Sequence, residues 1–97
     1  MIKHVTLVQL HPETTAEQRA TIVAAFSELP NHVDTIVDFW VGADLSLLEG
    51  NHDISVIATF NSEEDFLGYS THVAHMDVVF PVCGPHMAGY ATAQIAI

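Results

Sequence analysis

Apolar and polar residues alternate over residues 2–10, the pattern typical of a strand with one buried face. The residues expected on one side of this strand are Ile2, His4, Thr6, Val8 and Leu10. Three further strands are predicted, over residues 35–41, 53–60 and 87–97. A loop is predicted between the second and third of these strands, over residues 42–50.

Two segments between the strands have helical signals instead. Thr15 stands three residues before Gln18, the spacing of a capping box that satisfies the first free amides of a helix. Apolar residues then recur at helical spacing (Ile22, Phe26 and Leu29), and Pro30 predicts the end of this helix. Ser62 predicts the start of a second helical segment, which extends to about Cys83 with a break over 68–71 and a stop over 81–85.

The predicted order is β-α-β-β-α-β, the split βαβ pattern, within a single domain over residues 1–97. It indicates an α+β, ferredoxin-like fold with a four-stranded antiparallel sheet and the helices on one face. The other sheet face is also apolar, because Ile54 and Ile57 belong to opposite sides of one strand. We therefore expect a homodimer in which two sheets face each other, a dimeric α+β barrel.

The charge of the chain argues against two classes of partner, nucleic acids and anionic membranes. Twelve acidic residues oppose only two basic ones, Lys3 and Arg19, for a net charge of −10. Nucleic acids and anionic membranes are bound mainly through Lys and Arg, so neither is an expected partner. The single Cys83, with no membrane span and no secretory leader in the pattern, predicts an unprocessed cytoplasmic protein.

Seven histidines are the strongest candidates for chemistry, and Tyr69, His72 and His75 lie together in the second helical segment. On a continuous helix His72 and His75 would share one face, and a histidine beside a tyrosine hydroxyl can serve as a general base. Two alternatives stay open. The pair could bind a metal ion with His52 or His86 as a third ligand, or these histidines could be hydrogen-bonded packing residues.

The last predicted strand bears on whether a cavity exists. Its small residues, Gly89, Ala91 and Ala93, share one side, where a packed sheet normally places larger side chains. If His4 points toward the helices, we expect it to share a hollow with the helical histidines. Side chains of Phe26, Tyr69 and Phe80 are the candidates to fill that hollow.

Three short motifs resemble the stress-responsive A/B barrel (Dabb) family: Lys3-His4, Phe39-Trp40-x-Gly42 and His72-x-Ala-His75. The resemblance covers nearly the whole chain and implies a dimeric, ferredoxin-like α+β barrel. A plant polyketide cyclase of this family closes a linear polyketide by aldol condensation without a cofactor. The resemblance implies that its Tyr and His match Tyr69 and His75 here, and that its pocket histidine matches His4.

Departures from that plant enzyme argue for a different substrate. Phe26 stands where it has a tyrosine, His86 where it has a tryptophan, and Val73 replaces a proline. We therefore expect a pocket for a small carbonyl compound of aromatic or polyketide-like character, with no metal or cofactor.

In this hypothesis His75 is the general base, Tyr69 binds the developing enolate oxygen and His4 orients the substrate. Phe26, His72 and His86 are further substrate contacts. Two alternatives are a non-catalytic structural dimer and a cofactor-free monooxygenase of the same fold.

Overall fold

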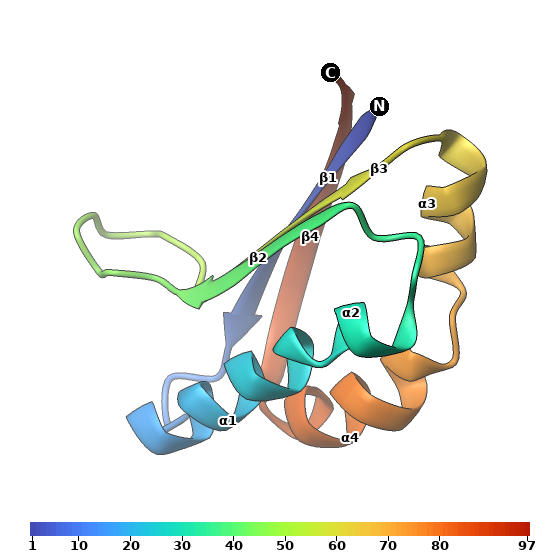
Figure 1. The fold of residues 1–97 in the computed structure, drawn as a ribbon. Helices are drawn as coiled ribbons and strands as arrows, with labels where there is room; N and C mark the ends of the chain where they lie inside the picture. Colours follow the sequence, from blue (N-terminus) through green and yellow to red (C-terminus); the bar gives the residue numbers. More distant parts are fainter.

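The computed structural model describes all residues from Met1 to Ile97. Its elements are β1 (Ile2–Leu10), α1 (Ala16–Ser27), α2 (Leu29–His32), β2 (Asp38–Ala43), β3 (Ile54–Phe60), α3 (Glu63–Ser70), the π-helical turn η1 (His75–Val79), α4 (Phe80–Cys83), the 3₁₀ turn η2 (Gly84–His86) and β4 (Met87–Ala96). The four strands form one antiparallel sheet in the order β2-β3-β1-β4. All the helices lie on one face of this sheet, and the two chain ends lie side by side (Figure 1). The predicted α+β, ferredoxin-like fold is confirmed.

The first helix begins as its sequence predicts. The Thr15 hydroxyl accepts a hydrogen bond from the Gln18 amide, and the Gln18 side chain accepts one from the Thr15 amide. The prediction that Pro30 stops the helical segment is wrong by a turn, because Pro30 occupies the first turn of α2. Proline lacks only an amide hydrogen that would be unpaired at that position.

The second strand and the second helical segment also differ in detail from the prediction. β2 is displaced toward the C-terminus, because the chain before it turns, with Ile36 donating its amide to the Val33 carbonyl. Helix α3 ends at Ser70, within the predicted break, and short helical turns then continue to His86. Pro81 and Pro85 do not end the segment, since each stands in the first turn of a new element.

The hydrophobic core lies between the sheet and the helices. The side chains with no solvent exposure are Ile22, Leu29, Ile54, Ala58 and Phe60, each at 0%. Burying one large apolar side chain contributes roughly 1.5–3 kcal/mol. Of the two sides that the alternation along β1 predicts, the even-numbered one faces this core, with His4, Val8 and Leu10 buried.

One end of the sheet is fastened to α1 by Asp53. Its carboxylate accepts hydrogen bonds from the Leu10 amide (2.7 Å) and from the Arg19 guanidinium. Partial burial alone would raise the pKa of the Asp53 carboxyl, but these two donors outweigh it and lower that pKa. The loop between β2 and β3 projects away from the body of the molecule (Figure 1). None of the helices is both long enough and apolar enough to cross a membrane.

Candidate functional site

His4 lies in the middle of the sheet with only 7% of its surface exposed. It stands opposite Ala58 of β3 and Gln94 of β4. Its Nε2 is 2.9 Å from the Thr6 hydroxyl, and its Nδ1 is 3.0 Å from the Gln94 side-chain nitrogen. With the Gln94 amide donating to Nδ1, the ring is the neutral tautomer that carries its proton on Nε2. Burial lowers the pKa of His4, and the nearby His75 lowers it further.

Tyr69 occupies the last turn of α3 and is 4% exposed. Its ring packs against those of Phe60 and His4, with centroids 4.9 Å and 5.9 Å away. Burial raises the pKa of its hydroxyl to about 12, so the phenol stays protonated near neutral pH. The hydroxyl forms none of the hydrogen bonds within the chain, which leaves it free to donate one to a ligand.

His75 begins the π-helical turn η1, a rare element that frequently occurs at functional sites. Its ring meets the Tyr69 ring edge-on at 4.5 Å. Its Nδ1 is buried and has no hydrogen-bond partner, an exception that calls for a physical reason. Burial lowers the pKa of His75. The nearby His72 backbone raises this pKa, but by less than burial lowers it. The imidazole is therefore an uncharged base near neutral pH.

These three side chains border one cavity of about 390 Å³ between the sheet and the helices. Small-molecule sites have volumes of roughly 300–1,000 Å³. The residues that line this cavity are His4, Thr6, Phe26, Val56, Phe66, Tyr69, Ser70, His75, Tyr90, Thr92 and Gln94. We refer to it below as the histidine cavity.

Comparison with known families and structures shows what the chain is related to. The statistical model of the stress responsive A/B barrel domain, Dabb, matches residues 2–93. The chain belongs to the Dabb family. No match was found among curated proteins.

Solved structures share this Dabb fold over the whole chain. A dimeric ferredoxin-like protein of unknown function from Thermobifida fusca has 29% identity and a TM-score of 0.86, with 99% of this chain and 90% of that chain covered. Hydroxynitrile lyase from Passiflora edulis has 17% identity and a TM-score of 0.80, with 99% and 92% covered. An antibiotic biosynthesis monooxygenase has 11% identity and a TM-score of 0.73, with 100% and 98% covered. At these last two identities the likeness concerns the fold alone.

Within this Dabb domain, four of the predicted site residues meet at the histidine cavity: His4, Phe26, Tyr69 and His75. His72 does not, because α3 ends at Ser70 and His75 starts a new turn, so the two histidines are not on one helical face. The His72 Nδ1 accepts a hydrogen bond from the Ala74 amide at 3.1 Å, and its ring borders a separate hollow beside Asp34 and Asp65.

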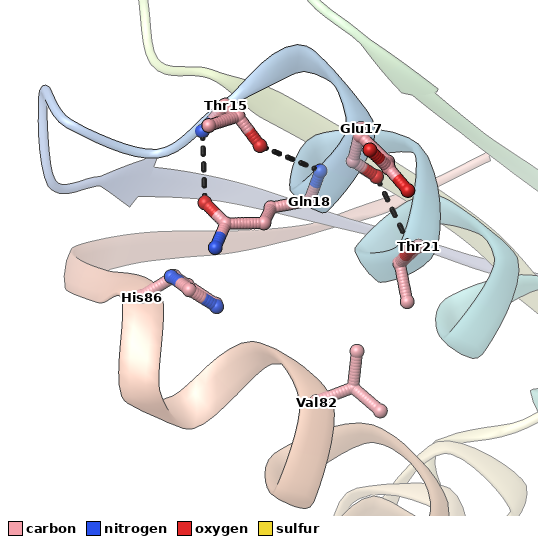
Figure 2. Close-up of a pocket in the computed structure, with 6 residues that line it drawn as sticks. All are labelled: Thr15, Glu17, Gln18, Thr21, Val82 and His86. Carbon is pink, nitrogen blue, oxygen red and sulfur yellow. Dashed lines mark hydrogen bonds between the residues drawn. The ribbon is translucent and has the colours of Figure 1, made fainter.

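His86 also lies away from the histidine cavity. Figure 2 shows it beside the first turn of α1, in a surface hollow that it shares with Gln18 and Val82. This hollow is shaped by the capping box of Thr15, whose two hydrogen bonds are drawn there. In the alternative with a metal ion, His72 and His75 would coordinate the same ion together with a third ligand. No group of three or more His, Cys, Asp or Glu side chains is placed to do so.

The expectation that small residues of the last strand border the hollow is wrong. The cavity is lined by Tyr90, Thr92 and Gln94, which stand opposite Val8, Thr6 and His4. Successive side chains of a strand point to opposite faces, so the small residues Gly89, Ala91 and Ala93 lie on the face without helices. Alternation shows which residues share a face, but only the register with β1 shows which face that is. Phe80, another expected filler, is half exposed and lies outside the cavity.

Sequence reasoning missed several residues of the cavity wall, above all Thr6 and Gln94. The sequence contains a feature that points to each of these two residues. Thr6 lies on the same side of β1 as His4, two residues along, and Gln94 is a lone amide among the apolar and small residues near the end of β4. What was lacking was the pairing of His4 with Gln94 across two strands 90 residues apart in the sequence.

Proposed function

We propose that this Dabb protein binds a small carbonyl compound of aromatic or polyketide-like character in the histidine cavity and acts on it as a cofactor-free lyase or cyclase. One observation carries the proposal. Tyr69 and His75 both line the 390 Å³ cavity, their rings pack edge-on with centroids 4.5 Å apart, and the Tyr69 hydroxyl forms no hydrogen bond within the chain. A hydroxyl donor beside an uncharged imidazole base supplies the two groups that acid–base chemistry on a carbonyl compound requires.

In the cyclase reaction, His75 takes a proton from the carbon next to a carbonyl group. The electron pair of the broken C–H bond moves onto the carbonyl oxygen, and the resulting enolate oxygen accepts a hydrogen bond from Tyr69. The enolate carbon then attacks a second carbonyl of the same molecule and forms a C–C bond. The alkoxide produced takes the proton back from His75, so the base is restored without a cofactor.

The lyase reaction uses the same groups in the opposite sense. His75 takes the hydroxyl proton of a carbonyl adduct, the adjacent C–C bond breaks, and the leaving carbanion receives the proton. The hydroxynitrile lyase that shares this fold supports this direction. The role of His4 is to orient the substrate, since Thr6 and Gln94 hold its ring in place. Phe26 provides an apolar contact at the cavity wall.

The assembly we propose is a homodimer that joins the sheet faces without helices. Related structures, including the one from T. fusca, are described as dimeric. This face is apolar, with Trp40 67% and Ile95 54% exposed. Strand residues contribute one charge of each sign to it, Lys3 and Asp38, so two copies can approach without the repulsion that a net charge of −10 otherwise creates.

The test is turnover of linear polyketide thioesters and of aromatic cyanohydrins by the wild-type protein and three variants. We expect His75→Ala to lower kcat by about 10²–10⁴-fold and Tyr69→Phe by about 10²–10³-fold. His11→Ala, a change at an exposed histidine outside the cavity, is the matched control and should leave kcat unchanged. Because burial lowers the pKa of His75, the acidic limb of the kcat profile should lie below pH 6.5.

Two results would contradict the proposal. Turnover that survives His75→Ala would exclude His75 as the base. Oxygen uptake with a quinol substrate, with no reaction on either carbonyl panel, would favour the monooxygenase alternative that another structure of this fold suggests.

A further inference from the structure

We infer that the ligand of the histidine cavity is an uncharged molecule, such as a ketone, an aldehyde or its neutral adduct, and that carboxylates and phosphates are excluded. This inference rests on the proposed function and adds the charge of the substrate to it. It depends on how the chain distributes its few positive charges relative to the cavity wall.

Every polar group on the wall is uncharged in its ordinary state or is an imidazole. Hydroxyl groups come from Thr6, Ser70, Thr92 and the two tyrosines, and an amide comes from Gln94. The remaining polar groups are the rings of His4 and His75, and the rest of the wall is apolar, from Phe26, Val56 and Phe66. Such a surface donates and accepts hydrogen bonds but offers no permanent charge to pair with an anion.

The basic groups of the chain are all placed elsewhere. Lys3 points to the face of the sheet without helices, since it alternates with His4 along β1. Arg19 is held by the Asp53 carboxylate and by the Thr14 carbonyl. The amino group of Met1, just before β1, donates a hydrogen bond to the carbonyl of Ile97, just after β4.

An anion that enters the cavity must therefore leave water without a partner of opposite charge. Transfer of a charge from water onto a wall that offers no opposite charge is more costly than transfer of a neutral carbonyl group that gains a hydrogen bond. The net charge of −10 also repels anions from the whole molecule. Burial lowers the pKa of both His4 and His75, so the rings do not replace the missing charge near neutral pH. We expect a preference of at least tenfold for the neutral member of a matched pair of ligands.

Phenylacetone and phenylacetate form such a pair, because a methyl group in one replaces the charged oxygen of the other. Binding is measured at pH 8 from the imidazole NMR signals of His4 and His75 in the full chain. The expected result is a Kd for the ketone at least tenfold below that for the carboxylate. Equal or tighter binding of the carboxylate would overturn the inference while leaving the cavity as a small-molecule site. If neither compound shifts these signals, the proposed binding site fails as well.

A gain of function completes the test. Thr92→Lys places a positive charge on the cavity wall at an exposed position of β4, where the change should not disturb folding. Ala24→Lys adds the same charge at an exposed position of α1 outside the cavity and is the matched control. We expect Thr92→Lys, but not Ala24→Lys, to strengthen phenylacetate binding at least tenfold. If Thr92→Lys folds as judged by circular dichroism and gains no affinity for phenylacetate, missing charge is not the cause of exclusion and the inference is wrong.

Discussion

The two faces of the sheet consist of alternate residues of the same strands, yet they differ in what they contain. On the face that the helices cover, Val8, Ile54 and Val56 are buried, and the polar cluster of His4, Thr6 and Gln94 lies beside them. The open face has apolar side chains as well, but Trp40 and Ile95 remain largely exposed. Apolar character alone therefore does not distinguish the face that the helices cover from the open face. The two faces are distinguished by the hydrogen-bonded polar groups, since the cluster of His4, Thr6 and Gln94 lies on the covered face.

The difference has a physical origin in what covers each face. Helices deliver side chains of varied length, and between Phe26, Tyr69 and His75 they leave a cavity lined by polar atoms. The small residues Gly89, Ala91 and Ala93 instead belong to the open face. Small side chains permit close approach of another surface, as we expect for a second sheet in the proposed dimer.

The largest effect is expected from a charge at the centre of the open face. Ile57 lies there between Val5 and Trp40 on the neighbouring strands. Ile57→Glu would bury unpaired carboxylates in the dimer, and we expect it to halve the molar mass measured by light scattering at micromolar concentration. Ala24→Glu, the same change of charge on the outside of α1, should remain dimeric. A wild-type monomer, or a dimer that survives Ile57→Glu, would contradict the role given to this face.

A smaller effect, on stability, is expected on the covered face. Phe60 is 0% exposed and packs against Phe66 and Tyr69 at ring distances of 5.8 Å and 4.9 Å. Phe60→Ala should lower the free energy of unfolding by about 3–5 kcal/mol, from lost burial and the cavity left behind. Phe80→Ala removes the same group where the side chain is half exposed, and it should cost less than half as much. Urea unfolding of both variants measures this, and equal losses would show that the core is not where the structure places it.

The smallest effect concerns pH and belongs to the covered face alone. Burial lowers the pKa of His4 and His75 in the folded chain below the ordinary value of 6.5. At a pH between the folded pKa and 6.5, the unfolded chain therefore binds more protons than the folded one. These histidines cost no stability above pH 6.5, and they reduce it as the pH falls below that value. We expect the urea midpoint to decrease from pH 7.5 to pH 5.5, and to decrease less in a His4→Gln, His75→Gln double variant. An equal decrease in both proteins would show that other groups cause it.

Local patterns were sufficient for much of this molecule. The order of the elements, the capping box at Thr15 and the alternation along β1 follow from interactions within a few residues, and the structure agrees with each. The end of α3 within the break predicted over residues 68–71 is another such case. Less local features were predicted less well. The start of β2 depends on a turn after α2, and no alternation in the strand itself shows where that turn ends.

The sequence by itself determined which side chains alternate, where the helices begin and that positive charge is scarce, because these properties depend on neighbouring residues or on composition. Only the tertiary structure decided which side of β4 faces the helices, and with it that Gln94 rather than Ala93 stands beside the cavity. It also decided that His75 meets Tyr69 while His72 turns away, since the helix is interrupted between them. These outcomes depend on strand register and on the path of the chain between elements, which are set by contacts between residues far apart in the sequence.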